Sequence, residues 1–86
     1  GNEYYGIISS ITSFGIFVEL ENTIEGLVRL IEMNDDYYIY DDINKILVGK
    51  EKKKVYKLGQ KVKIEVIYAD KQTRKIDFKL IDDNES

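Results

Sequence analysis

The chain has 86 residues, 43% of them hydrophobic, with a formal net charge of −3 and neither cysteine nor histidine. This length predicts one domain, residues 1–86, near the lower size limit for a single core. Without cysteine there is no disulfide or thiolate metal site, and without histidine the commonest metal ligand and general base are missing. No segment approaches the roughly 20 apolar residues of a membrane span, and no signal-peptide pattern opens the chain. We therefore expect a soluble, cytoplasmic monomer.

The charges are segregated along the chain. Residues 1–44 contain nine acidic residues and one basic residue, Arg29, whereas residues 45–79 contain twelve basic and four acidic residues. The last seven residues add three acidic side chains. This segregation favours one basic face that could steer an anion. The alternative is a solvated, lysine-rich edge that discourages strand pairing.

The first half of the chain predicts three strands in meander order. Residues 4–11 are rich in β-branched and aromatic residues, which is typical of a strand. Residues 12–15 form a turn in which Gly15 permits a bulge or a close backbone approach. Residues 15–20 alternate, with Ile16, Val18 and Leu20 on the core face, and residues 24–30 follow a polar turn as a third strand.

The middle and the end of the chain complete the fold prediction. Residues 31–36 suggest a short helical turn, and the extended pieces 37–42, 45–49 and 55–56 suggest a small hairpin around a charged tip. Alternation then predicts strands at residues 61–66 and 75–80, joined by a connection at 68–74. The acidic tail, residues 82–86, is expected to fray. The prediction is an all-β, five-stranded antiparallel barrel with a core at about residues 3–81, the helical turn and the hairpin lying between strands three and four.

Two aromatic rings stand out on the outer side of this barrel. Phe17 points away from the core face of its strand, and Phe14 precedes it at the glycine bend. Aromatic rings on a wet sheet surface can stack on unpaired nucleic-acid bases, a contact worth roughly 1–3 kcal/mol per base. The tyrosines at 37, 38 and 40 are instead interpreted as packing for the inserted segment.

Five blocks of the sequence, in order, resemble an S1 domain. They are Gly6 to Ile8, Phe14 to Leu20, Glu25 to Val28, Leu58 to Val62, and Asp70 to Phe78. The resemblance implies an OB-fold barrel that binds RNA.

A narrower resemblance lies in the middle of the chain. Asp36 to Tyr38, Tyr40 with Asp41, Leu47 to Gly49, Tyr56 to Gly59, and Ile76 to Phe78 look like the S1 domain of the ribonuclease R family. That resemblance implies a module of a processive 3′-to-5′ exoribonuclease, with the parent's catalytic and cold-shock domains and single-stranded RNA as partners. The family's Mg²⁺ site and catalytic aspartates lie in its catalytic domain. This chain is thus expected to bind RNA without cutting it and to hold no cofactor of its own.

The resemblance also implies a set of RNA-binding residues. Phe14 and Phe17 match the family's two aromatics, and Asp70 and Arg74 match the acidic and basic pair near the last turn. Arg29 occupies the usual histidine position, where a guanidinium can still stack on a base and bind a phosphate. Structural alternatives stay open: either arginine could pair only with Glu19 or Asp70, and Asp70 could serve to form the turn or to orient Arg74.

The lysines of the second half are candidates for phosphate contacts, or else simply solvated. They are Lys50, Lys52, Lys53, Lys54, Lys61 and Lys63, with Lys57 nearby.

Two other functions are alternatives to RNA binding. The first is a structural or protein-interaction barrel, because an OB fold alone does not decide function. The second is a Mg²⁺ or Ca²⁺ site on Asp35, Asp36, Asp41 and Asp42, which the lack of any ion-loop spacing disfavours. The sequence predicts no metal site and no catalytic residue.

Overall fold

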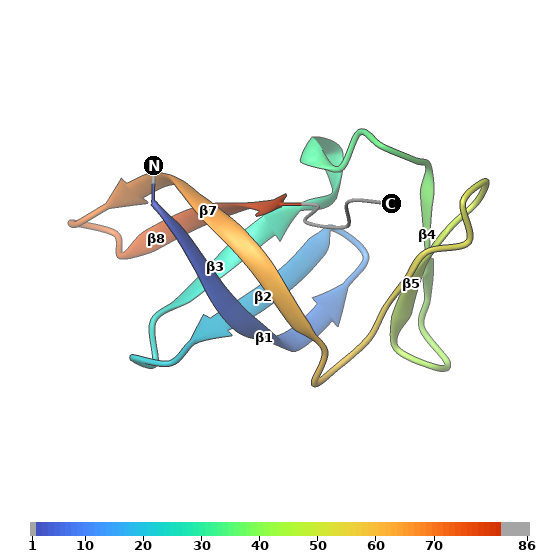
Figure 1. The fold of residues 1–86 in the computed structure, drawn as a ribbon, viewed down its shortest axis with the longest axis horizontal. Coiled ribbons are helices and arrows are strands. Elements are labelled where there is room, and N and C mark those ends of the chain that lie inside the picture. Colours follow the sequence, from blue (N-terminus) through green and yellow to red (C-terminus); the bar gives the residue numbers. More distant parts are fainter. Residues whose placement is uncertain (1, 82–86) are drawn as a thin grey trace.

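A computed structural model describes residues 2–81, and it consists almost entirely of β-structure (Figure 1). The elements are β1 (Glu3–Thr12), β2 (Gly15–Leu20), β3 (Glu25–Arg29), a 3₁₀ turn η1 (Leu30–Glu32), β4 (Tyr38–Asp41), β5 (Ile46–Gly49), β6 (Val55–Tyr56), β7 (Lys61–Asp70) and β8 (Lys75–Ile81). No helix within residues 2–81 is long and apolar enough to cross a membrane. The predicted frayed tail, residues 82–86, lies outside the described residues.

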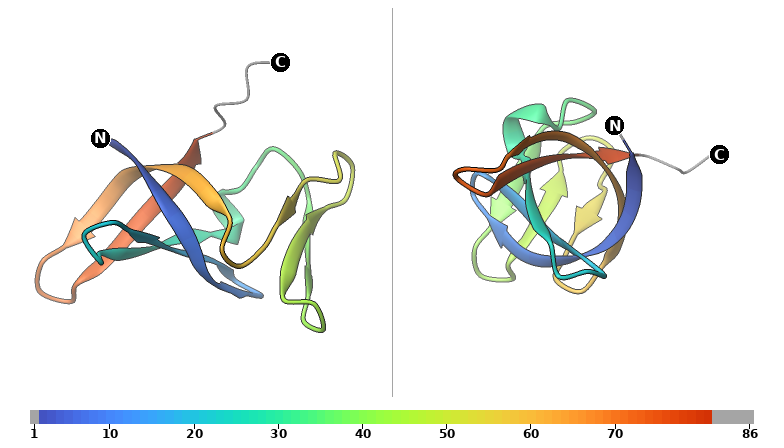
Figure 2. Two further views of the ribbon diagram at one scale, coloured as in Figure 1. Left: turned by 60° about the horizontal axis from the view of Figure 1, so that its bottom comes forward. Right: turned by 90° about the vertical axis from the view of Figure 1, so that its left-hand side faces the viewer.

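Five strands close into a barrel in the order β1-β2-β3-β8-β7, visible from its end in Figure 2. The number of strands and the closure are as predicted, but the expectation of a purely antiparallel barrel is wrong. β3 and β8 run parallel, with Leu27 opposite Asp77, while the other neighbouring pairs are antiparallel. The reason is parity: five strands cannot alternate in direction around a closed ring, so at least one neighbouring pair must be parallel.

The core follows the predicted alternation. Ile16 and Val18 of β2 are fully buried, as are Ile64 of β7 and Phe78 of β8. The Phe78 ring lies under β3 at Gly26, where a side chain would collide with it. One buried cluster spans the barrel and continues into the inserted segment.

The inserted segment forms a three-stranded sheet, β4-β5-β6, where a small hairpin was predicted. It lies at the end of the barrel opposite the β7–β8 turn (Figure 1). Tyr38, Leu47 and Tyr56 are buried and belong to the same cluster as the barrel core. The predicted helical turn at 31–36 is confined to η1, and the rest of that stretch is a connection to β4.

We expect Gly26→Ala to destabilise the fold, because a Cβ at this position would lie 2.6 Å from Cζ of Phe78. Overpacking of this kind costs about 1–3 kcal/mol, which urea or thermal unfolding would resolve. Phe78→Leu shortens the clashing side chain, so the double variant should be more stable than the sum of the two single effects predicts. Strict additivity in this cycle would contradict the Gly26–Phe78 contact as the cause.

Candidate nucleic-acid interface

Two phenylalanine rings meet edge to face on the outer side of β2. Phe17 is half-buried between the buried residues Ile16 and Val18, and Phe14, in the turn before the strand, is 57% exposed. Their ring centroids are 6.2 Å apart and their planes are perpendicular. The predicted pair of outward-facing aromatics is therefore present.

The turn before β2 is tied down on both sides of Phe14. The hydroxyl oxygen of Thr12 accepts hydrogen bonds from the amides of Phe14 and Gly15, each at 3.2 Å. The carbonyl of Phe14 accepts a hydrogen bond from the amide of Leu30 in η1, at 2.9 Å. These contacts fix the backbone from which the more exposed ring projects.

Strand register continues this surface across four strands of the barrel. Phe17 on β2 lies opposite Leu27 on β3, Leu27 lies opposite Asp77 on β8, and Asp77 lies opposite Tyr68 on β7. Leu27 and Tyr68 are not among the site residues that the sequence predicts. Tyr68 was expected in a connection, whereas β7 continues to Asp70 with an irregularity between Val66 and Tyr68.

Arg29 lies beside this row and pairs with Asp77. Its guanidinium is 3.4 Å from the Asp77 carboxylate, and the side chains are 54% and 19% exposed respectively. Neither partner suggested by the sequence, Glu19 or Asp70, is the one in this ion pair. The sequence does not predict Asp77 as the partner, because the ion pair depends on the parallel β3–β8 pairing, which local alternation does not reveal.

Asp70 ends β7 and Arg74 directly precedes β8. Both therefore lie near the start of β8, whereas Arg29 lies beside its later part. The Asp70 carboxylate accepts hydrogen bonds from the amides of Gln72 (3.0 Å) and Thr73 (3.5 Å), and the Gln72 bond is the main reason its pKa falls below the ordinary value. Asp70 thus has the turn-forming role that was one of its expected roles. Arg74, with φ of 59°, closes the same turn three residues before Asp77.

A groove of about 840 Å³ lies between the barrel and the segment that leads from η1 into β4. Its lining includes Phe14 and Arg29 from the barrel, Leu30 and Ile31 of η1, and Tyr37 and Tyr38 at the entry to the inserted sheet. Of the residues that the sequence proposed for RNA contacts, Phe14 and Arg29 line this groove, and the inserted segment supplies its other wall. Phe17, Asp70, Arg74 and the candidate lysines are not among its lining residues.

The two adjacent tyrosines in that wall have different environments. Tyr38 is buried against Tyr56, with ring centroids 5.7 Å apart, and its hydroxyl donates to the Asp35 carboxylate at 2.9 Å. Burial, reinforced by this bond, raises the pKa of Tyr38, so the hydroxyl remains a donor. Tyr37 is 70% exposed. The packing role predicted for the tyrosines therefore holds for Tyr38 and for Tyr40, which packs partly buried against the core, and is wrong for Tyr37.

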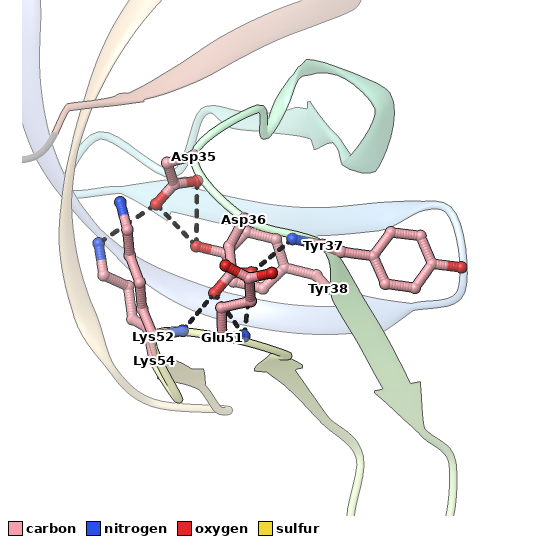
Figure 3. Close-up of polar contacts among 7 residues, drawn as sticks. All are labelled: Asp35, Asp36, Tyr37, Tyr38, Glu51, Lys52 and Lys54. Carbon is pink, nitrogen blue, oxygen red and sulfur yellow. Dashed lines mark hydrogen bonds and ion pairs between the residues drawn. The ribbon is translucent and has the colours of Figure 1, made fainter.

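The Asp36 carboxylate fastens this wall to the β5–β6 turn (Figure 3). It accepts hydrogen bonds from the amides of Tyr37 (2.7 Å), Glu51 (3.2 Å) and Lys52 (2.8 Å). The Lys52 amide is the largest of the influences that lower the pKa of Asp36. A Cβ at Gly49 would lie 2.5 Å from Asp36 Oδ2, so glycine at that position leaves room for the carboxylate.

The candidate lysines divide into two groups. Lys61 and Lys63 on β7 hold their ammonium groups 4.9 and 5.7 Å from the Tyr5 ring centroid, and Lys63 also pairs with Glu3 at 3.3 Å. Lys54 pairs with Asp35 at 3.6 Å. These three, with Lys79, line a second cleft of about 720 Å³.

The remaining candidates, Lys50, Lys52 and Lys53, belong to the connection between β5 and β6 and do not line that cleft.

Three of the four acidic residues that could have held a cation, Asp35, Asp36 and Asp41, have other partners. Asp41 accepts hydrogen bonds from Asn44 and from the amide of Ile43, and Asp35 and Asp36 make the contacts described above. Within residues 2–81 no three acidic side chains gather as a set that could hold a metal ion.

Comparison with known proteins identifies the family. The S1 RNA binding domain model matches residues 1–81. Ribonuclease R of Ureaplasma parvum is 51% identical over 94% of the chain, and that of Escherichia coli is 42% identical, also over 94%. The matches cover 11% and 10% of those two proteins, so the chain spans about a tenth of their length.

Solved structures agree with the sequence relatives. Mycoplasma genitalium RNase R, as the apo form and in complex with ribose-methylated single-stranded RNA, superposes with a TM-score of 0.87 and 33% identity in each case. The superposition covers 94% of this chain and 13% of each of those chains.

We expect Asp36→Asn to lower the melting temperature at neutral pH, because an amide has one acceptor oxygen for three backbone donors. The pKa of Asp36 lies below its ordinary value of 3.8 in the folded chain. The carboxylate therefore stabilises the fold fully above about pH 4 and loses that effect as the pH falls through the folded pKa. The difference in melting temperature between wild type and variant should narrow in acid.

Asp42→Asn, in the β4–β5 turn, is the matched control and should melt like the wild type. If the melting temperature of Asp36→Asn stays below that of the wild type by the same amount from neutral to acid pH, the ionised carboxylate is not the stabilising group.

Proposed function

Since the chain belongs to the S1 RNA-binding domain family, we propose that it is one domain that holds single-stranded RNA on the outer face of β2, β3 and β8. The observation that carries the proposal is the pair Phe14 and Phe17, whose rings lie outside the core beside the groove that Arg29 lines. Unpaired bases expose flat π faces that stack on such rings with little sequence preference.

Arg29 supplies the cation of this face. Its ion pair with Asp77 is half-exposed on the arginine side, and exposed pairs of this kind contribute only about 0–1 kcal/mol. The guanidinium can therefore turn to a phosphate or a base at little cost, and its planar donors suit either. Asp70 acts by stabilising the β7–β8 turn. That turn holds Arg74 just before β8, where it can contact the bound RNA.

The lysines contribute longer-range attraction. Lys54, Lys61 and Lys63 converge on one cleft, and a cation beside an aromatic ring, as at Tyr5, combines phosphate attraction with a stacking surface. Lys50, Lys52 and Lys53 extend the positive field beyond the cleft. Such contacts raise the affinity for RNA at low salt, and their contribution falls as the salt concentration rises.

The relatives point to the larger setting of this domain. Those described above are ribonucleases R, and one solved neighbour carries single-stranded RNA. We infer that the domain works within a cytoplasmic 3′-to-5′ exoribonuclease, as a single copy beside catalytic and cold-shock domains. Its task there is to hold RNA near the active site and raise its local concentration. Cleavage and Mg²⁺ binding belong to the catalytic domain.

We expect Phe17→Ala to weaken binding of a labelled single-stranded RNA of about ten nucleotides, within the roughly 4–16-nucleotide site size of OB folds. Losing one base stack of about 1–3 kcal/mol corresponds to a drop of about 5- to 150-fold in affinity. Fluorescence anisotropy measures the affinity, and thermal melting checks the fold.

Two variants make this experiment decisive. Phe17→Leu keeps an apolar group on the half-buried site without the π face and should lose affinity as Phe17→Ala does. Ile43→Ala removes an exposed apolar side chain in the β4–β5 turn and should bind like the wild type. Unchanged binding by a well-folded Phe17→Ala would argue for a protein-interaction barrel instead.

Lys61→Gln should reduce the salt dependence of binding. Loss of one phosphate contact lowers the slope of log affinity against log salt by about 0.7 for a single strand. Lys45→Gln is the control, because it removes the same charge from the β4–β5 turn, at the other end of the inserted sheet from the β5–β6 turn. Equal slopes for the two variants would remove the cleft from the RNA path.

A further inference from the structure

We propose that the groove between η1 and β4 receives a further nucleotide of the bound strand, and that the Tyr37 ring stacks on its base. The inference rests on the proposed function and extends its site to the inserted sheet. Three large apolar side chains surround this one hollow or its rim: Phe14 is 57% exposed, Tyr37 70% and Ile31 81%. Water-exposed apolar groups concentrated around one groove mark a binding surface.

The backbone of Tyr37 is held rigidly. Its amide donates to Asp36 at 2.7 Å, and its carbonyl accepts from the amide of Lys50 at 2.8 Å. The next residue, Tyr38, is buried in the common core. Figure 3 shows the Tyr37 ring directed away from the cluster of Asp35, Tyr38 and Lys54. Because the backbone is already ordered, stacking here costs little conformational entropy.

Continuity favours RNA as the occupant of the groove. Phe14 and Arg29 belong both to the proposed RNA face and to the groove, so a strand that stacks on Phe17 and Phe14 reaches Tyr37 next. The volume of about 840 Å³ lies within the range of roughly 300–1,000 Å³ that small-molecule sites occupy. A base and its ribose therefore have room.

The charges of the groove are compatible with this occupant. Arg29 supplies a cation for a phosphate. Asp36 is the acidic residue among the described lining residues, and its carboxylate is directed at backbone amides. Those donors offset the negative charge where the strand would pass.

The test uses Tyr37→Trp and Tyr37→Ala. The chain has no tryptophan, so Tyr37→Trp places a single indole reporter at the groove. Adding single-stranded RNA of about ten nucleotides, within the roughly 4–16-nucleotide site size of OB folds, should quench its fluorescence by stacking, with affinity equal to or above the wild type. Tyr37→Ala should weaken binding of that RNA about tenfold. Tyr37→Ala should reduce the affinity for a shorter RNA of roughly four nucleotides much less, because that RNA is long enough for the phenylalanine face alone.

Tyr4→Trp and Tyr4→Ala are the matched controls, because Tyr4 is a partly exposed tyrosine on β1 that does not line the groove. Loss of binding by Phe17→Ala together with unchanged binding by Tyr37→Ala and no quenching of Tyr37→Trp would overturn this inference and leave the proposed function intact. Absence of RNA binding by the wild type would overturn both. Should Tyr37→Ala melt abnormally, the quenching of Tyr37→Trp decides alone.

Discussion

The parallel pairing of β3 with β8 is the contact on which the rest of this structure depends. A ring of five strands must contain such a pair, and here it forms at Leu27 opposite Asp77. It is possible because Gly26 leaves space for the Phe78 ring beneath β3. Closing the barrel at this seam also brings β2, β3 and β8 side by side on its outside. The cross-strand row Phe17, Leu27, Asp77 and the Arg29–Asp77 ion pair are therefore products of closure, whereas the Phe14–Phe17 ring pair belongs to β2 and the turn before it.

The inserted sheet turns this outer face into a groove. Its strands share a core with the barrel through Tyr38 and Tyr56, and the Asp36 carboxylate joins the start of β4 to the β5–β6 turn. The hydrogen bonds of Asp36 and the burial of Tyr38 in the common core hold this wall in position and in orientation.

The sequence predicted what depends on local alternation and missed what depends on contacts between distant strands. The core positions of β2, β7 and β8 follow from period two, and so does the outward direction of Phe17. The partner of Arg29 does not follow from period two, because it depends on the register of the parallel strands β3 and β8, in which Leu27 lies opposite Asp77. Tyr37 and Tyr38 are the same residue type in adjacent positions, and only the path of the chain into β4 decides which of them is buried. Composition likewise could not divide the lysines, which lie both beside Tyr5 and at the tip of the inserted sheet.

A chain with net charge −3 can bind an anion because its charges act locally. Several acidic side chains are engaged within the fold: Asp35 with Tyr38 and Lys54, Asp36 and Asp70 with backbone amides, and Asp77 with Arg29. Lys54, Lys61, Lys63 and Lys79 line one cleft together with Glu32 and Asp35, so cations outnumber carboxylates there and the local charge is positive. In the proposed mode of binding, base stacking on Phe14 and Phe17 depends little on salt, whereas lysine contacts to phosphates depend on it strongly. Neither contribution reads base identity, and this combination suits a domain that must hold any single strand passing over it.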